Sequence, residues 1–182
     1  MSEQVTVTVY TFDELEESVK KKVIDKARED VDVDSEFVCD TFKEQLEELG
    51  YPIEDIRFRL SSSQGDGVAF YGRFDPEPVL RRLNIDIEPI KEHLEHSWMI
   101  RKVGSGTYYD HYNSMEIDPG DGYDDVLQSS VDVVKEDVVK TSKILEHMGY
   151  ELIDAQISDE SVIDFVQANE YRFLKDGRVF RQ

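Results

Sequence analysis

The sequence predicts an α+β fold in which antiparallel hairpins pack with several amphipathic helices. Segments with strand and helix patterns come in blocks, and this order favours α+β over an alternating βαβ series. Three pairs of short strand-like segments flank glycine-containing turns. One helical pattern near residues 125–148 is about six turns long. For a chain of 182 residues, we expect a single α+β domain over residues 1–182.

The N-terminal part is predicted to hold one strand and two helices. Valines alternate with polar residues over 5–10, which indicates a half-buried strand. A capping-box pattern at residues 11–14 then begins a helix over 12–29. A second amphipathic helix is expected over residues 35–49, with Gly50 as its C′ residue.

The first hairpin is predicted from alternating segments at residues 56–60 and 68–73, joined by residues 61–67. Glycines beside exposed amides can form an anion-binding nest. No clear helix follows, however, and the Gly-Lys-Ser/Thr end of a phosphate-binding loop is missing. We therefore interpret this connection as a turn in which Asp66 bonds locally.

Two short helices and a second hairpin are expected next. A break at residues 75–78 precedes a helix over 79–83, and another helix is expected over 88–96. The hairpin pairs residues 98–103 with 108–117. In its second strand, alternation places Tyr108 and Tyr112 on one face and Tyr109 and His111 on the other. One of these faces is predicted to be core, and the other is either core or an aromatic interface.

The C-terminal part is predicted to be helical with a final hairpin. The long helix near 125–148 should stop at Gly149. Ser158 is a candidate cap for a helix over 159–169. An Asp-Gly pair then turns the chain between the short strands 171–174 and 178–180.

The net charge of −20 is the strongest functional signal in the sequence. Such a field repels phosphate backbones, which disfavours direct nucleic-acid binding, and it attracts basic protein surfaces. Solubility or adaptation to high salt is the alternative reason for this acidity. The single cysteine, Cys39, and the lack of a secretory leader pattern predict a cytoplasmic protein, and no apolar run is long enough to span a bilayer.

The acidic residues are unevenly distributed. No lysine or arginine occurs between Lys102 and Lys135. We predict that the acids of this span form a partner-binding face, made of Asp110, Glu116, Asp118, Asp121, Asp124, Asp125 and Asp132. A second acid-rich region covers residues 25–55.

Patterns for catalysis or metal binding are weak. The four aspartates of residues 118–125 offer oxygen ligands for calcium, but their spacing is not that of an EF-hand. His93 and His96 could share a helix face, but zinc needs further ligands. Cys39 has apolar and acidic neighbours, which disfavour a thiolate. We therefore predict no enzyme activity, no cofactor and no bound metal.

Several motifs resemble those of a group of acidic proteins that bacteriophages encode. The matching stretches are Thr11-Phe-Asp-Glu-Leu15, Leu46-Glu-Glu-Leu-Gly50, Ser63-Gln-Gly-Asp-Gly67 and the Ala-Asn-Glu-Tyr-Arg-Phe run at 168–173. The resemblance implies a phage origin and the cytoplasm of an infected bacterium. Some members of the group are labelled antitoxin-like.

From the charge and this resemblance, we predict a non-enzymatic protein that inhibits a host DNA-binding or defence protein, such as a nuclease or restriction factor. DNA mimicry is one way in which an acidic face could do so. Three alternatives stay open: an antitoxin-like protein that neutralises a basic toxin, a metal-dependent module that uses residues 118–125 or the His93 and His96 pair, and a structural phage protein whose acidity serves solubility.

Overall fold

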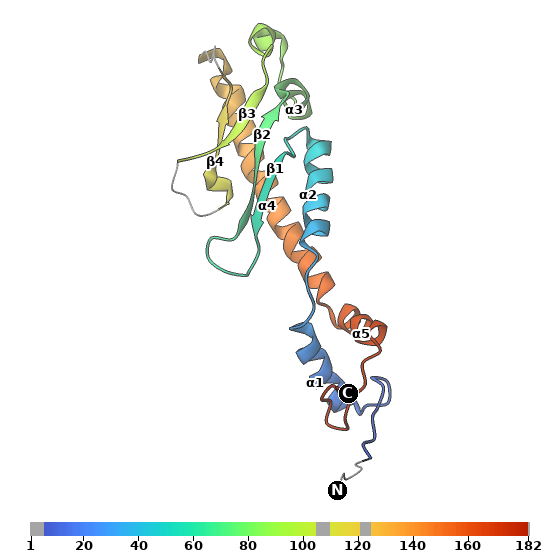
Figure 1. Cartoon of the computed structure of the whole chain (residues 1–182). Coiled ribbons are helices and arrows are strands. Elements are labelled where there is room, and N and C mark those ends of the chain that lie inside the picture. Colours follow the sequence, from blue (N-terminus) through green and yellow to red (C-terminus); the bar gives the residue numbers. More distant parts are fainter. Residues whose placement is uncertain (1–5, 105–109, 121–124, 182) are drawn as a thin grey trace. The chain divides into compact units, whose positions relative to one another are not determined.

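A computed structural model describes residues 6–104, 110–120 and 125–181, and its α+β fold confirms the predicted class (Figure 1). The chain divides into two compact units, Met1–Asp34 with Leu152–Gln182, and Ser35–Glu151. We call these the terminal unit and the sheet unit. The elements, in chain order, are α1 (Glu17–Arg28), α2 (Ser35–Leu49), β1 (Asp55–Arg59), β2 (Gly67–Phe74), α3 (Pro76–Arg82), η1 (Glu88–His93), β3 (Trp98–Lys102), η2 (Tyr112–Ser114), β4 (Met115–Asp118), η3 (Asp125–Leu127), α4 (Gln128–Gln156) and α5 (Asp159–Ala168).

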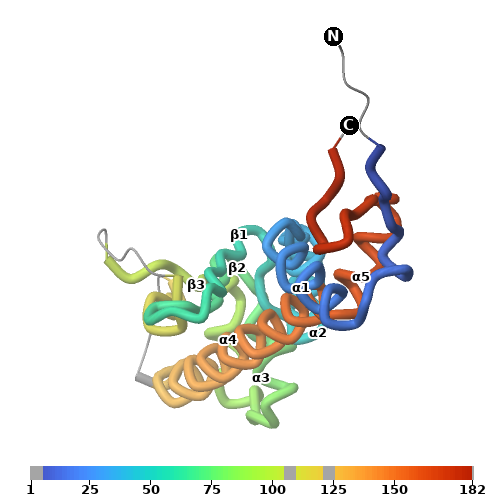
Figure 2. The backbone as a smooth tube through the Cα atoms, turned by 90° about the horizontal axis from the view of Figure 1, so that it is seen from below, coloured from blue at the N-terminus to red at the C-terminus, as the bar shows by residue number. Residues whose placement is uncertain are grey.

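The sheet unit is built on a four-stranded antiparallel sheet in the order β1-β2-β3-β4. Figures 1 and 2 show α4 running along one face of its strands. On that face, the ring of Phe42 from α2 packs edge-on against Phe58 of β1, with ring centroids 5.3 Å apart. The buried hydroxyl of Ser142 in α4 donates to the carbonyl of Val68 in β2. Both helices therefore cover the same, apolar face of the sheet.

The opposite face of the sheet is charged. Alternation and register place Arg73, Met99 and Asp118 side by side across β2, β3 and β4, and Arg101 opposite Glu116 one step along. Each of these side chains is at least partly exposed. This face is solvated over β3 and β4, whereas Ala69 and Tyr71 of β2, which alternation places on the same face as Arg73, are buried.

Helix α4 is longer than predicted, because Gly149 does not end it. A Cβ atom at Gly149 would lie 2.3 Å from Leu60 Cδ1 and 2.8 Å from Phe42 Cζ. The glycine is therefore a close-packing position between α2, α4 and the end of β1. The expected stop at Gly149 is wrong, whereas Gly50 has a φ of 79° directly after α2, as predicted for a C′ residue.

Two further boundaries of the sheet unit differ from the prediction. Asp75 was expected to break the chain, yet its side chain accepts a hydrogen bond from the amide of Glu77 (3.0 Å) and caps α3, with Pro76 at the first helical position. The second strand of the second hairpin begins only at Met115, because residues 112–114 form the turn η2. The alternation expected for His111 and Tyr112 is therefore wrong, and Tyr108 and Tyr109 lie outside the described residues.

The terminal unit has its own apolar core, formed by Phe12, Leu15, Val23, Ile24, Ala27, Val162, Val166 and Phe173. Ser158 caps α5 by accepting from the amide of Ser161, as predicted (3.3 Å). In place of the strand predicted at 5–10, the structure has a single β-bridge between Tyr10 and Phe173. The predicted final hairpin is likewise reduced to a single β-bridge, between Phe173 and Val179.

The predicted capping box at residues 11–14 forms in part. The carboxylate of Glu14 accepts from the amide of Thr11 (2.8 Å), but helix α1 begins only at Glu17. Within the described residues, no helix is both long and apolar enough to cross a membrane.

Candidate partner-binding surface

The acids predicted to form a partner-binding face are largely paired where the structure describes them. Asp110 accepts from the ammonium of Lys102 at 2.8 Å and is only a quarter exposed. Arg101 of β3 lies 3.4 Å from the carboxylate of Glu116 and 3.1 Å from that of Asp118, both on β4. These three carboxylates are therefore at least partly neutralised by cations from the neighbouring strand.

The remaining predicted residues lie nearer to α4. Asp132 is exposed in the first turns of α4 and accepts from the side-chain amide of Gln128 at 2.9 Å. Asp125 opens η3. Asp121 and Asp124 lie outside the described residues.

Helix α2 carries the more strongly acidic surface. Its buried stripe is Val38, Phe42 and Leu46, and the opposite side holds exposed acids, which we call the α2 acidic face: Glu36, Asp40, Glu44, Glu47 and Glu48. Among the described residues, its one ion pair joins Asp40 to Lys43 (2.7 Å). No basic residue of α2 itself lies in its last turn, but the guanidinium of Arg82 donates to the carbonyl of Leu49 at 3.2 Å and partly compensates the negative end of the helix dipole.

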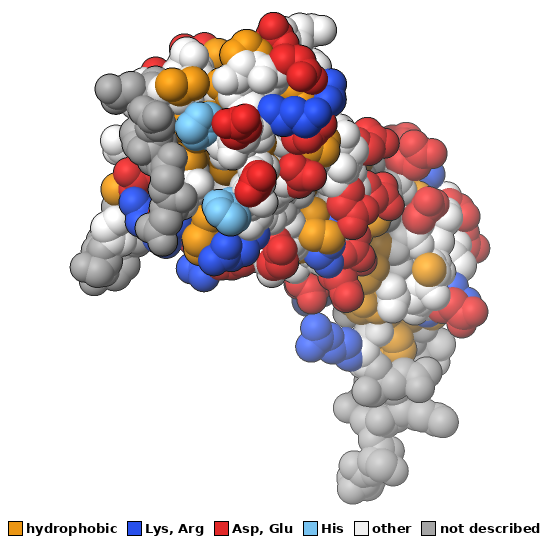
Figure 3. All heavy atoms as spheres, turned by 90° about the horizontal axis from the view of Figure 1, so that it is seen from above, with side chains coloured by type: hydrophobic (Ala, Val, Ile, Leu, Met, Phe, Trp, Pro, Cys, Tyr) orange, Lys and Arg blue, Asp and Glu red, His pale blue; other side chains and the backbone are white. Residues whose placement is uncertain are grey.

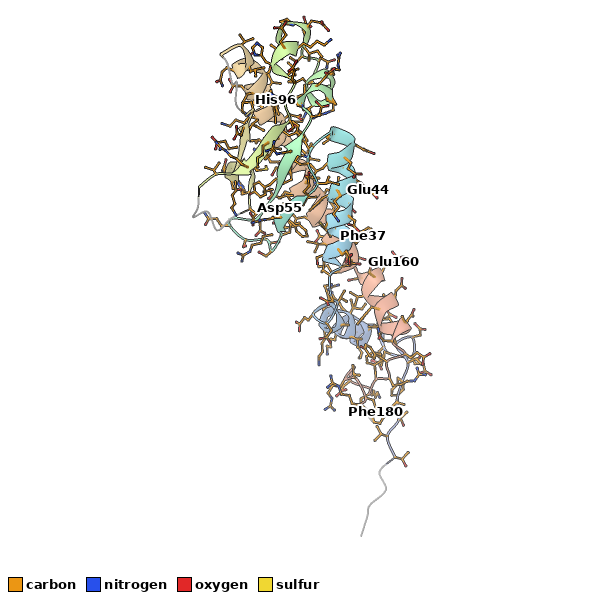
Figure 4. The ribbon with its side chains drawn as sticks, turned by 45° about the horizontal axis from the view of Figure 1, so that its top comes forward. Phe37, Glu44, Asp55, His96, Glu160 and Phe180 are labelled. Atoms are coloured by element: carbon orange, nitrogen blue, oxygen red, sulfur yellow. The ribbon has the colours of Figure 1, made fainter. Side chains whose placement is uncertain are left out.

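The α2 acidic face has a regular spacing and an aromatic neighbour. Glu36, Asp40, Glu44 and Glu48 recur every four residues, which puts them about 6 Å apart along one side of the helix. Phe37 is 52% exposed, and Figure 4 labels it on α2 together with Glu44. In the space-filling view of the whole molecule in Figure 3, carboxylate side chains are widespread, and lysine and arginine side chains lie in small groups beside them.

The turn at residues 61–67 provides its own anion. The buried carboxylate of Asp66 accepts from the amides of Ser61 (2.6 Å) and Ser63 (3.0 Å) and from both serine hydroxyls. The hydroxyl of Tyr150 from α4 donates to it at 2.6 Å. Burial alone would raise the pKa of Asp66, but the hydrogen bonds from Tyr150 and the two serine residues outweigh burial and hold this pKa well below its usual range. The nest that a ligand would need is thus filled by the chain itself.

The same turn contacts the segment at residues 110–114. A Cβ atom at Gly67 would lie 2.9 Å from the imidazole of His111. Ser114 is buried there and shares hydrogen bonds with the hydroxyl of Tyr71 (2.9 Å) and the carbonyl of His111 (2.6 Å). Because these polar groups satisfy one another, this junction is a packed structural contact.

The candidate metal ligands do not converge among the described residues. His93 and His96 are both exposed, at the end of η1 and just beyond it. In residues 6–104, 110–120 and 125–181, no group of three or more His, Cys, Asp or Glu side chains is placed to hold a metal ion. Cys39 is a free, partly buried thiol within α2.

Comparison of the chain with protein-family models, with curated proteins and with solved structures finds no match. The functional argument therefore depends on the surface itself. The acid-rich region at 25–55 was visible in the sequence, but the pairing of Arg101 with Glu116 and Asp118 depends on strand register, which the sequence pattern did not determine.

Proposed function

We propose that this protein is a non-catalytic binding protein whose α2 acidic face docks on a basic surface of another protein. The observation that carries the proposal is the row of exposed carboxylates on α2, because Glu36, Glu44, Glu47 and Glu48 take part in no ion pair with a described cation. Their field is therefore directed to solvent, where it steers a basic partner toward the helix.

The proposed partner is a host DNA-binding or defence protein, a choice that combines the acidity of the chain with the phage origin that the resemblance implies. A surface that binds a phosphate backbone offers a row of cations, and the α2 acidic face offers carboxylates about 6 Å apart along its axis to meet them. Phe37 at the start of the row is a suitable aromatic anchor. Occupation of that surface would inhibit the partner without chemical change.

The test is capture of partners from a bacterial lysate, followed by affinity measurements on the purified complex. We expect the affinity to fall steeply with salt and duplex DNA to compete for the partner. The triple variant E36Q/E44Q/E48Q removes three unpaired charges and should weaken binding about tenfold or more at low salt. Its matched control is E116Q/D118N, whose carboxylates already face Arg101; it should bind nearly as well as the wild type. Equal affinity of the triple variant and the wild type, or binding that does not respond to salt, would contradict the proposal.

A further inference from the structure

Helix α4 carries a surface of the opposite character to α2. Its exposed side forms a shallow groove of about 420 Å³ lined by Glu136, Val139, Lys140, Lys143, Ile144 and His147. Ile144 is 48% exposed. Lys140 has no ion pair with a described acid, and the ammonium of Lys143 lies 4.6 Å from the ring centroid of Tyr112. His147 is already engaged, since its Nε2 lies 3.4 Å from the carboxylate of Glu151. We call the part of this surface around Lys140 and Lys143 the α4 basic stripe.

Helices α2 and α4 are antiparallel, and two contacts show which residues of one lie beside which residues of the other. The hydroxyl of Tyr51, just after α2, donates to the carboxylate of Asp137 at 2.7 Å. Phe42, in the middle of α2, lies against Gly149. Tyr51 thus lies beside Asp137, and Phe42 beside Gly149, so the residue numbers of the two helices run in opposite directions. Residues 44–48 of α2 therefore lie beside residues 140–147 of α4.

Ile144 lies near the seam between these helices. It follows Asp137 by seven residues, or about two helical turns, and therefore projects from the same side of α4. That side faces α2, since Asp137 bonds to Tyr51 there. The helical layer of the sheet unit thus has an acidic half, a basic half and an exposed aliphatic side chain between them.

We infer that a second copy of this chain binds this helical layer to form a two-fold symmetric dimer. A two-fold axis parallel to the helices, between α2 and α4, places the α2 of each copy over the α4 of the other. Because the rotation keeps each residue at the same height along the helices, Glu44, Glu47 and Glu48 of one copy then meet Lys140 and Lys143 of its partner. The two Ile144 side chains lie close to the axis, which gives an apolar centre with a charged rim.

A second copy fits this layer better than an unrelated partner does, because the layer is complementary to itself. The acids at 44–48 and the lysines at 140 and 143 lie side by side along the two helices, which a two-fold interface requires and an unrelated partner would not. The inference goes beyond the proposed function and has one consequence for it. The dimer covers part of the α2 acidic face, so a basic partner and a second copy exclude each other.

Sedimentation velocity of the full chain from low to high micromolar concentration tests this. We expect a reversible dimer for the wild type, and monomers for K140E/K143E and for E44K/E48K, because each variant opposes like charges. When these two variants are mixed, each helix again faces opposite charge, and a heterodimer should form. The control K91E/K175E changes the charge equally at exposed lysines elsewhere and should dimerise like the wild type.

A wild-type chain that is monomeric throughout, a dimer that survives in both charge-reversed variants, or a mixture that stays monomeric would each overturn the dimer. I144D gives a further readout, since a charge near the axis should also produce monomers. Because K140E/K143E leaves α2 intact, loss of the dimer with retained capture of a basic partner would separate this inference from the proposed function.

Discussion

In the sheet unit, the carboxylates of α2 have different surroundings from those of the strands and of the turn at residues 61–67. On α2, four of the five acids of the α2 acidic face lack a described cation partner and are exposed. On the strands and the turn between them, Asp66 is buried among hydrogen-bond donors, and Glu116 and Asp118 face Arg101. The density of acids along the chain is therefore a poor measure of the field that a partner meets.

The difference separates two uses of the same chemical group. A carboxylate that accepts several hydrogen bonds stabilises the fold, and its charge is hidden from solvent. An unpaired carboxylate on a helix surface contributes little to folding and retains its charge for association. Substitutions of carboxylates on the strands and in the turn at residues 61–67 should thus affect stability most, and substitutions of the acids of α2 should affect binding most.

The largest expected effect on stability is that of D66N. The substituted amide places an NH₂ group among the donors of Ser61, Ser63 and Tyr150, so the turn loses charge-assisted hydrogen bonds in a buried position. We expect the free energy of unfolding to fall by about 3 kcal/mol, measured by urea denaturation at neutral pH. Y150F, which leaves the four serine contacts to Asp66 in place, should cost about 1 kcal/mol. If D66N were as stable as the wild type, the bonded role of this carboxylate would be wrong.

The pH dependence checks the same assignment. Since the pKa of folded Asp66 is lowered, its contribution is complete above the unfolded pKa of about 4 and is lost as pH falls through the folded pKa. The stability difference between wild type and D66N should therefore be constant near neutral pH and shrink in acid. A gap that widened in acid would contradict the direction of this shift.

Local patterns predicted the elements well where one local signal dominated. The amphipathic stripe of α2 and its glycine stop gave correct bounds at 35–49, and the alternation of residues 56–60 and 68–73 located β1 and β2. The prediction failed at Gly149, where the same glycine signal has a tertiary cause: the close approach of Leu60 and Phe42. A sequence pattern alone does not distinguish a glycine that ends a helix from one that admits a neighbour.

The next largest effect is expected for G149A, which tests how α2 and α4 are held together. Helix propensity alone would make alanine more stable by up to about 1 kcal/mol. The added methyl group would meet Leu60 and Phe42, and overpacking costs about 1–3 kcal/mol, so we expect a net loss of about 1–2 kcal/mol in urea denaturation. In a double-mutant cycle with F42L, the smaller side chain should relieve part of this loss. Stabilisation by G149A would mean that glycine is not required for packing there.

The partner-binding surface was harder to predict than the fold because it depends on pairing across the sheet. The span between Lys102 and Lys135 has no cation of its own, yet Arg101 reaches Glu116 and Asp118 because β3 and β4 are antiparallel. A charge count along the chain omits such a neighbour. On α2, by contrast, the neighbours of each acid are local, and helical spacing alone describes the face.

The smallest effects on stability are expected from substitutions of surface carboxylates, and the sign of the effect should differ between α2 and β4. E36Q/E44Q/E48Q relieves repulsion along α2, so the urea midpoint should be unchanged or slightly higher. E116Q/D118N removes partners of Arg101, so stability should fall by about 0.5 kcal/mol. Both effects are electrostatic and should diminish in high salt. If the α2 variant lost more stability than the β4 variant, its carboxylates would have a structural role, and the separation between folding and binding charges would fail.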